Sequence, residues 1–155
     1  MRLWRIGSAV FPVWSAEGAR LHGGRWNRPG TPAIYAATSY ASAVLELLVH
    51  ANMGRVPNGF HHISIDIPTF AKIETLETHE LPDWDTMPPG ESLSFGDAWL
   101  RTNRALVLLV PSVVTGGMDA NAIINPRHPD FRHIAVSEEA PVRWDTRLSP
   151  PRPDR

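Results

Sequence analysis

The sequence of 155 residues contains no cysteine, and its 15 basic residues include a single lysine, Lys72. Without cysteine, neither disulfide bonds nor thiolate zinc sites can hold the fold, which excludes a small secreted disulfide scaffold. The sequence also lacks a run of about eighteen apolar residues, and it lacks an apolar segment ahead of a small-residue cleavage site. We therefore expect a cytoplasmic protein that does not span a membrane.

Positive charge is not in excess either. Lysine and arginine total 15 against 16 acidic residues, which gives a formal net charge of -1. Proteins that bind nucleic acid or anionic membranes through their charge carry a basic surplus, so we expect no direct contact with either. Neither a G-x-G-x-x-G nor a Walker phosphate loop is present, so any dinucleotide must be held in another way. The seven histidines form no His-x-x-x-His pair, and we expect no metal.

Length and composition predict one domain. With 155 residues, 43% of them hydrophobic and 20% charged, the chain is long enough for one substantial core and too short for a second. We place a single domain at residues 1–148. The last residues, 149–155, are rich in proline and charge, and we expect a disordered tail there.

The patterning predicts short strands and few helices. Strands are expected at 3–6, 33–37, 60–67, 105–110 and 131–136, and helices at 39–51 and 94–104, with Ser39 and Ser94 as N-caps. Few of these strands are separated by crossover helices. The predicted class is therefore α+β with small mixed or antiparallel sheets, not a doubly wound fold.

Residues 66–97 are strongly acidic, with eight acidic side chains and one base. Four prolines interrupt the segment, so regular structure is not expected over most of it. Two interpretations stay open: a solvated irregular excursion, or a docking surface for a basic partner.

The stretch GGRWNRPGTPAIYAATSYASAVLELLVH, residues 23–50, concentrates the chemistry. Arg25 follows two glycines, which let an anionic ligand approach the main chain while the guanidinium grips it. Tyr35 lies in a short apolar strand, and Glu46 and His50 share one face of the helix that follows. The four side chains have spacings that one pocket could use.

Each of these residues also has an ordinary interpretation. Arg25 could be a turn residue with a solvated head, and Tyr35 a core residue with its hydroxyl tied to the backbone. His50 could be satisfied by the end of its helix. Glu46 is harder to dismiss, because a carboxylate on a helix that is apolar nearly all round requires a partner or a function.

The run at 23–50, with LVPSVV and NAIINPRHPDF later in the chain, closely resembles the RES domain over residues 3–136. This domain is the toxin half of a bacterial type II toxin–antitoxin pair whose antitoxin carries an Xre-type helix-turn-helix. The family takes its name from an Arg, a Glu and a Ser, which correspond here to Arg25, Glu46 and Ser112. Tyr35 and His50 also match at the same offsets from Arg25.

The resemblance implies an ADP-ribosyltransferase-like fold that takes NAD⁺ as its substrate. It implies cleavage of the bond between nicotinamide and ribose, and depletion of cellular NAD⁺ by hydrolysis or phosphorolysis. Two alternatives remain: a mono-ADP-ribosyltransferase that modifies a specific bacterial protein, and a non-enzymatic binding module that acts through its antitoxin. The resemblance further implies a homodimer within the toxin–antitoxin complex.

Roles for the matched residues follow from their chemistry. Cleavage passes through an oxocarbenium-like state, which Glu46 can stabilise by accepting a hydrogen bond from the ribose 2-hydroxyl. The planar guanidinium of Arg25 suits the diphosphate. Tyr35 would stack on nicotinamide or ribose. Ser112 would either orient Glu46 or bond the carboxamide.

Two further residues complete the predicted site. His50, one turn beyond Glu46, would tune its charge or place the acceptor of the ADP-ribose group. Asn125 lies in a turn-like segment and is a weaker candidate for a contact with NAD⁺.

Overall fold

The computed structural model describes residues 1–51 and 58–148, and the tail predicted at 149–155 lies outside the described residues. The strands are β1 (Arg2–Ser8), β2 (Ile34–Ala37), β3 (Phe60–Asp66), β4 (Ile73–Thr75), β5 (Val107–Pro111), β6 (Ala120–Ile124), β7 (Ala135–Val136) and β8 (Ala140–Pro141). The helices are α1 (Glu17–His22), α2 (Tyr40–His50) and α3 (Glu91–Thr102), with 3-10 turns at Thr78–Glu80, Pro129–His133 and Thr146–Leu148.

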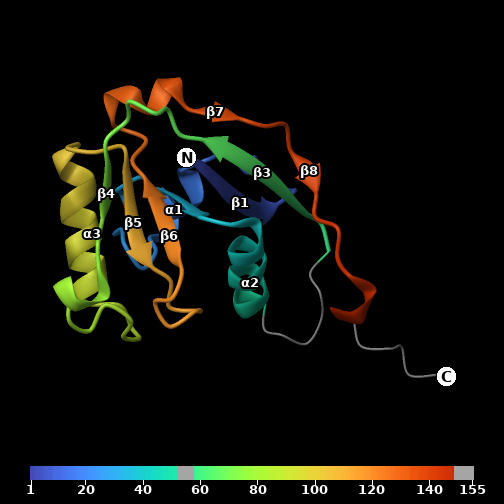
Figure 1. Cartoon of the computed structure of the whole chain (residues 1–155), viewed down its shortest axis with the longest axis horizontal. Coiled ribbons are helices and arrows are strands. Elements are labelled where there is room, and N and C mark those ends of the chain that lie inside the picture. The colour runs from blue at the N-terminus through green and yellow to red at the C-terminus, as the bar shows by residue number, and fades with distance from the viewer. Residues whose placement is uncertain (52–57, 149–155) are drawn as a thin grey trace.

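The strands join in one hydrogen-bonded path in the order β4-β5-β6-β2-β1-β3-β7, with β8 paired to β3. Among the described pairings, β4 with β5 is parallel and the others are antiparallel. The predicted α+β class with a mixed sheet is therefore confirmed. Figure 1 shows α3 alongside the end of the sheet formed by β4, β5 and β6, and α2 beside β1, away from α3.

Side-chain alternation along the central strands divides the core between two faces of the sheet. In β6, Ile123 packs with Trp99 and Leu100 of α3. Its neighbour Ile124 packs on the opposite face with a cluster that includes Leu3 of β1. Every second residue of a strand points to the same face of the sheet. The register of each strand therefore decides on which face its polar and charged side chains lie.

Helix α2 matches its predicted bounds to within one residue, and Ser39 caps it as predicted by accepting a hydrogen bond from Ser42 N at 3.0 Å. The sequence of this helix is apolar nearly all round, which predicts a buried element, but that expectation is wrong. Only Ser42 and Ala43 are buried, whereas Leu45 and Val49 are exposed. The reason is that α2 packs one side against β1 and β2 and leaves other sides open.

A predicted helix and a predicted strand have clearly different bounds in the structure. Helix α3 begins earlier, after Gly90, so Ser94 lies within the helix and is not its cap; Asn103 ends it in the left-handed conformation, with φ of 50°. The strand predicted at 131–136 is reduced to β7, because Pro129 starts a 3-10 turn that takes up the preceding residues.

Candidate active site

A cleft of about 710 Å³ opens between α2 and the strands β1, β2 and β6. Its wall includes residues from several segments that are distant in sequence. The charged and polar ones are Arg5, Arg25, Tyr35, Glu46, His50 and Asn121. The fold therefore brings together four of the predicted residues and adds two that were not predicted.

Glu46 projects from α2 and is held by two neutral donors. Its Oε1 accepts a hydrogen bond from Ser112 Oγ at 2.8 Å and another from Asn121 Nδ2 at 2.6 Å. Ser112 is buried at the end of β5, so its bond to Glu46 supports the orienting role and not direct contact with a ligand. Within residues 1–51 and 58–148, the second oxygen, Oε2, has no hydrogen-bond partner and remains available in the cleft.

The bonds around Glu46 also determine which way Asn121 points. A carboxylate can only accept, so the amide nitrogen of Asn121 must face it, and the amide oxygen must point away. That oxygen is buried and has no partner among the described residues. We therefore assign Asn121 a positioning function that leaves one acceptor unsatisfied, a cost of the kind tolerated at functional sites.

Tyr35 is fixed at the floor of the cleft by both functions of its hydroxyl. The O–H donates to Asn27 Oδ1 at 2.7 Å and accepts from Trp26 N at 3.0 Å. Burial raises the pKa of Tyr35 to about 12, so the phenol stays neutral at physiological pH. Gly24 makes this approach possible, because a Cβ there would lie 2.6 Å from the hydroxyl.

Arg25 follows Gly24 and reaches the loop between β4 and α3. Its Nη1 donates to the carbonyls of Trp84 at 3.1 Å and Thr86 at 2.9 Å, and its Nη2 lies 2.9 Å from the Met87 sulfur. All three partners are uncharged. The guanidinium is thus held in place at the cleft without losing its net charge to a carboxylate.

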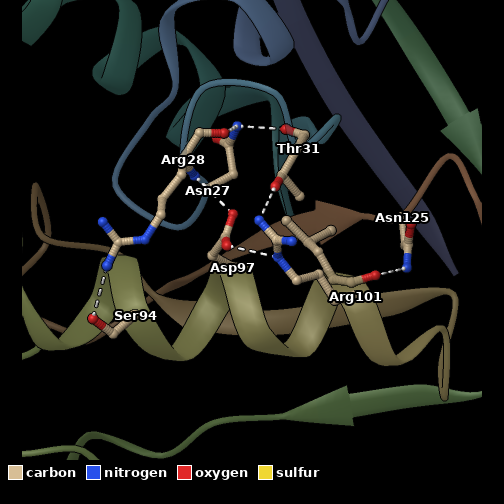
Figure 2. A network of polar contacts seen from close by, with 8 residues as sticks. Asn27, Arg28, Thr31, Ser94, Asp97, Arg101 and Asn125 are labelled. Atoms are coloured by element: carbon tan, nitrogen blue, oxygen red, sulfur yellow. Dashed lines mark hydrogen bonds and ion pairs between the residues drawn. The ribbon is translucent and has the colours of Figure 1, made fainter.

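The loop that carries Arg25 is clamped from below by α3 (Figure 2). Asp97 accepts from Arg28 N at 3.0 Å and from Arg101 Nε at 2.9 Å. Burial acts to raise the pKa of Asp97, but hydrogen bonds from Thr31, the Arg28 amide and Arg101 outweigh it and hold the pKa below its ordinary value. An ionised Asp97 therefore ties the loop to the helix.

Asn27 completes the clamp from inside the loop. It is fully buried, and its Nδ2 donates to the carbonyls of Ala19 and Thr31, both at 2.8 Å. Its Oδ1 receives the Tyr35 hydroxyl. The loop before β2 and the tyrosine within β2 are therefore one hydrogen-bonded unit.

His50 lies at the mouth of the cleft, one turn from Glu46. Its Nδ1 is 2.7 Å from the backbone carbonyl of Glu46. Because a carbonyl only accepts, Nδ1 must carry the proton. His50 thus bonds the backbone and not the Glu46 carboxylate, which favours the role of placing an acceptor over the role of tuning charge.

Asn125 is not in the cleft. It is 1% exposed, and its Nδ2 donates to Leu100 O and to Asn103 Oδ1, each at 2.9 Å. The two Nδ2 bonds join the end of β6 to the end of α3 (Figure 2), and the Oδ1 of Asn125 accepts from Arg127 N at 3.0 Å in a local turn. The predicted contact with NAD⁺ is not supported, because no free donor or acceptor faces the cleft.

Sequence reasoning missed Arg5 and Asn121. Each is the one polar residue in an otherwise apolar strand segment, LWRI and ANAII respectively. That pattern is a usable signal, but it does not say to which face the polar side chain is delivered. Register supplies the answer, since Asn121 stands opposite Ala37 of β2 and Val110 of β5.

Across the described ranges, no helix is long and apolar enough to cross a membrane. No three His, Cys, Asp or Glu side chains in that part of the chain gather closely enough to hold a metal ion.

Fold and cleft together define an α+β domain with separate cationic and anionic groups in one site. The chain belongs to the RES domain family, whose model matches residues 2–145. It is 39% identical over 138 residues to the Prs ADP-ribosylating toxin of Sphingobium sp. (86% of this chain, 85% of that protein). It is 38% identical over 153 residues to Toxin Res of Photorhabdus laumondii (96% of this chain, 97% of that protein). The predicted family membership is confirmed.

A solved structure shares the fold. The crystal structure of the M. tuberculosis MbcT-MbcA toxin-antitoxin complex contains a chain with a TM-score of 0.67 and 21% sequence identity, covering 91% of this chain and 83% of that one. At this identity the likeness speaks for the fold alone. It bears out the predicted α+β fold class.

Proposed function

We propose that this RES domain is the toxin of a toxin–antitoxin pair and that it cleaves the bond between nicotinamide and ribose in NAD⁺, depleting the cellular pool. One observation carries the proposal. Arg5, Arg25 and Glu46 share a cleft, yet no ion pair among the described residues includes any of them. A dinucleotide supplies a complementary charge to each kind of residue. Its diphosphate is negative and suits the two arginines, and its ribose becomes positive during cleavage and suits Glu46.

The proposed reaction breaks one bond and forms one bond. The bond between C1 of the ribose and the nicotinamide nitrogen breaks, and its electron pair leaves with nicotinamide. The ribose becomes oxocarbenium-like and is captured by an acceptor, either water or phosphate, which loses a proton. Glu46 stabilises this state through a strengthening hydrogen bond from the 2-hydroxyl to its free Oε2.

The remaining residues hold the reacting groups in place. Ser112 and Asn121 immobilise Glu46 Oε1, so that Oε2 keeps a constant direction. Arg25 binds the diphosphate, and the neutral ring of Tyr35 packs against nicotinamide or ribose. His50, which is exposed and lines the cleft, places the acceptor with its Nε2.

The test is product analysis on the purified full chain. Nicotinamide released from NAD⁺ is measured by chromatography with and without phosphate. We expect release by the wild type and a loss of about 10²- to 10³-fold in Glu46→Gln, the scale on which removing one electrostatic stabiliser acts. Normal turnover in a folded Glu46→Gln would overturn the role of Glu46, and no nicotinamide from the wild type would overturn the enzyme itself.

A second candidate is mono-ADP-ribosylation of a specific bacterial protein. It is favoured by the relative from Sphingobium sp., which is named as a Prs ADP-ribosylating toxin. Incubating the protein with labelled NAD⁺ and lysate separates the two, since only transfer leaves label on a protein. A non-enzymatic binding module, the third candidate, would release no nicotinamide in either experiment.

We also propose the setting in which the domain acts. Residues 1–148 form a single RES domain, which the family match to residues 2–145 supports. Its partner is an antitoxin with an Xre-type helix-turn-helix, two copies of the toxin pair within the complex, and the complex is cytoplasmic. With a net charge of -1, the toxin leaves DNA contact to that partner. Co-expression with the neighbouring open reading frame, followed by light scattering, tests the stoichiometry.

A further inference from the structure

Met87 stands at the wall of the cleft with its sulfur against the guanidinium of Arg25. The residue lies in the loop before α3, residues 81–90, and it is 78% exposed. Its Sδ is 2.9 Å from Nη2 of Arg25. An exposed thioether therefore touches the cation to which the proposed function assigns the diphosphate.

The chain contains four methionines and no cysteine, so methionine supplies the sulfur atoms that a peroxide can oxidise. The thioether of methionine is uncharged and is only a weak hydrogen-bond acceptor. Oxidation to the sulfoxide makes the side chain polar, and an enzyme can reverse the change. Exposure favours the reaction at Met87, because the oxidant must reach the sulfur.

The two terminal nitrogens of Arg25 respond differently to such a change. Nη1 donates to the carbonyls of Trp84 and Thr86, which belong to the same loop as Met87, so the loop already fixes that side of the guanidinium. Nη2 has the weakly accepting sulfur as its neighbour and can readily exchange that contact for a phosphate oxygen. A sulfoxide oxygen beside Nη2 is a strong acceptor with which the ligand must compete.

We propose that Met87 is a redox-modification site that controls access of the dinucleotide to Arg25. In the sulfoxide state the new oxygen accepts from Nη2, so the guanidinium is held by its own loop on both nitrogens. The inference rests on the proposed function and deepens it, because it adds regulation to the same cleft. The reduced state binds the ligand, and the oxidised state binds it more weakly.

The oxidant is hydrogen peroxide, and the step balances without any other reactant. The lone pair of the sulfur forms a bond to one peroxide oxygen, the O–O bond breaks, and water leaves. The sulfur loses two electrons and the peroxide gains them. A sulfoxide reductase that consumes two thiols reverses the step and yields a disulfide and water.

Arg5, the other arginine of the cleft wall, has different neighbours. It donates to the carbonyls of Val13 and Tyr35, each at 2.7 Å. Peroxide leaves these backbone acceptors chemically unchanged. Oxidation of Met87 therefore acts on one of the two guanidinium groups, so it weakens binding and does not abolish it.

The first test measures ligand binding before and after oxidation. The purified full chain is treated with hydrogen peroxide, peptide mass spectrometry follows each methionine, and ADP-ribose is titrated by calorimetry. We expect Met87 to be oxidised and ADP-ribose to bind roughly 10-fold more weakly, the scale of one hydrogen bond to a charged group. Treatment with methionine sulfoxide reductase and dithiothreitol should restore the affinity.

Matched variants assign the effect to one sulfur atom. Met87→Leu keeps a side chain of similar size that cannot be oxidised, so peroxide should leave its affinity unchanged. Met118 is 88% exposed and does not line the cleft, so Met118→Leu should respond to peroxide as the wild type does. Met87→Gln, which places an amide oxygen near Arg25, should weaken ADP-ribose without any peroxide.

A third comparison shows whether the effect passes through Arg25. In Arg25→Met no guanidinium is present for the sulfoxide to hold, so peroxide should cause no loss beyond that variant's own weaker binding. An equal further loss in Arg25→Met would overturn the proposal. Three other results would do the same: a Met87 that stays reduced while Met118 is oxidised, unchanged ADP-ribose binding when Met87 is fully oxidised, or a loss that persists in Met87→Leu.

Turnover separates this inference from the proposed function. The oxidised enzyme should show a higher KM for NAD⁺ and nearly the same kcat, because Glu46 and its partners are untouched. A protein that binds ADP-ribose according to the state of Met87 but releases no nicotinamide would overturn the enzyme and leave the redox-modification site. Nicotinamide release and ADP-ribose binding that both ignore oxidation would overturn that site and leave the enzyme, and a wild type that binds no ADP-ribose in either state would overturn the site as well.

Discussion

The charged side chains around α3 and those of the cleft are neutralised in different ways. Next to α3, Asp97 pairs with Arg101 at 2.9 Å, and Glu74 pairs with Arg104 at 2.9 Å and with Lys72 at 3.1 Å. In the cleft, the guanidinium groups bond carbonyls and the carboxylate bonds a hydroxyl and an amide. Each of these charges is positioned but not cancelled.

The difference separates framework from site. Near α3 the charge of Asp97 is balanced by Arg101, and the same carboxylate holds the loop at 26–31 to α3 by accepting from Arg28 N (Figure 2). A charge that is oriented by neutral groups keeps its field for a ligand. Three of the eight acidic side chains of segment 66–97 belong to the framework, since Asp66, Glu74 and Asp97 each pair within the chain. For those three side chains, neither a merely solvated excursion nor a docking surface describes their role.

The largest expected effect comes from replacing one carboxylate of the cleft, Glu46, and comparing it with the replacement of one ion-paired carboxylate near α3, Glu74. Glu46→Gln should lower nicotinamide release by about 10²- to 10³-fold and leave the unfolding midpoint unchanged. Glu74→Gln should do the reverse: it loses ion pairs, costs about 1 kcal/mol of stability, and leaves turnover intact. Steady-state kinetics and thermal unfolding on both variants measure this. A similar profile for the two would remove the distinction between framework and site.

Tyr35 should show its framework role at high pH. Its folded-state pKa is about 12 against an ordinary 10, so its stabilisation is complete below pH 10 and is lost as the pH rises from 10 to 12. The two-unit shift corresponds to roughly 3 kcal/mol. Urea unfolding at both ends of this window should show a larger alkaline loss for the wild type than for Tyr35→Phe. Tyr40 is present in both proteins, so its contribution cancels in the comparison. If the stability of the wild type and of Tyr35→Phe changed in parallel with pH, the buried neutral phenol of Tyr35 would be contradicted.

The two asparagines give a matched pair of intermediate size. Asn121→Leu frees Glu46 Oε1 and should lower kcat by roughly 10- to 30-fold with little change in KM, because the carboxylate is less well aimed. Asn125→Leu leaves Leu100 O and Arg127 N without partners, so it should lower stability and not kcat. Steady-state kinetics, measured at temperatures below the unfolding transition of both variants, tests this. Loss of kcat in Asn125→Leu at full fold would return that residue to the site.

The smallest effect concerns how closely α3 approaches the loop of Arg25. A Cβ on Gly96 would collide with the Trp26 backbone, whereas a Cβ on Gly18 of α1 would meet nothing within 4 Å. Gly18→Ala should therefore stabilise the protein by a fraction of the roughly 1 kcal/mol in helix propensity. Gly96→Ala should destabilise it by about 1 kcal/mol net, because overpacking outweighs that gain. Denaturant midpoints show whether each variant is more or less stable than the wild type. A gain in stability for both variants would mean that α3 does not pack closely against the Trp26 backbone.

The sequence was most informative about functional residues that lie close together along the chain. Arg25, Tyr35, Glu46 and His50 lie within 26 residues, and the α+β class follows from short strands with few crossovers. It was least informative where a side chain's use depends on a distant strand. Asn125 and Asn121 are both polar residues at or just beyond β6, but one is consumed by the end of α3 and the other faces Glu46.

What the sequence alone determined is the family, the class of fold and the residue types available for the chemistry, because motif spacing and periodicity are properties of neighbours along the chain. Only the tertiary structure decided which charges are cancelled and which are kept. Arg5 and Asn121 enter the cleft through the registers of β1, β2 and β6, which no local pattern encodes. The physical reason is that neutralisation depends on distances of a few ångströms between segments far apart in sequence, such as Glu46 and Asn121, which are 75 residues apart.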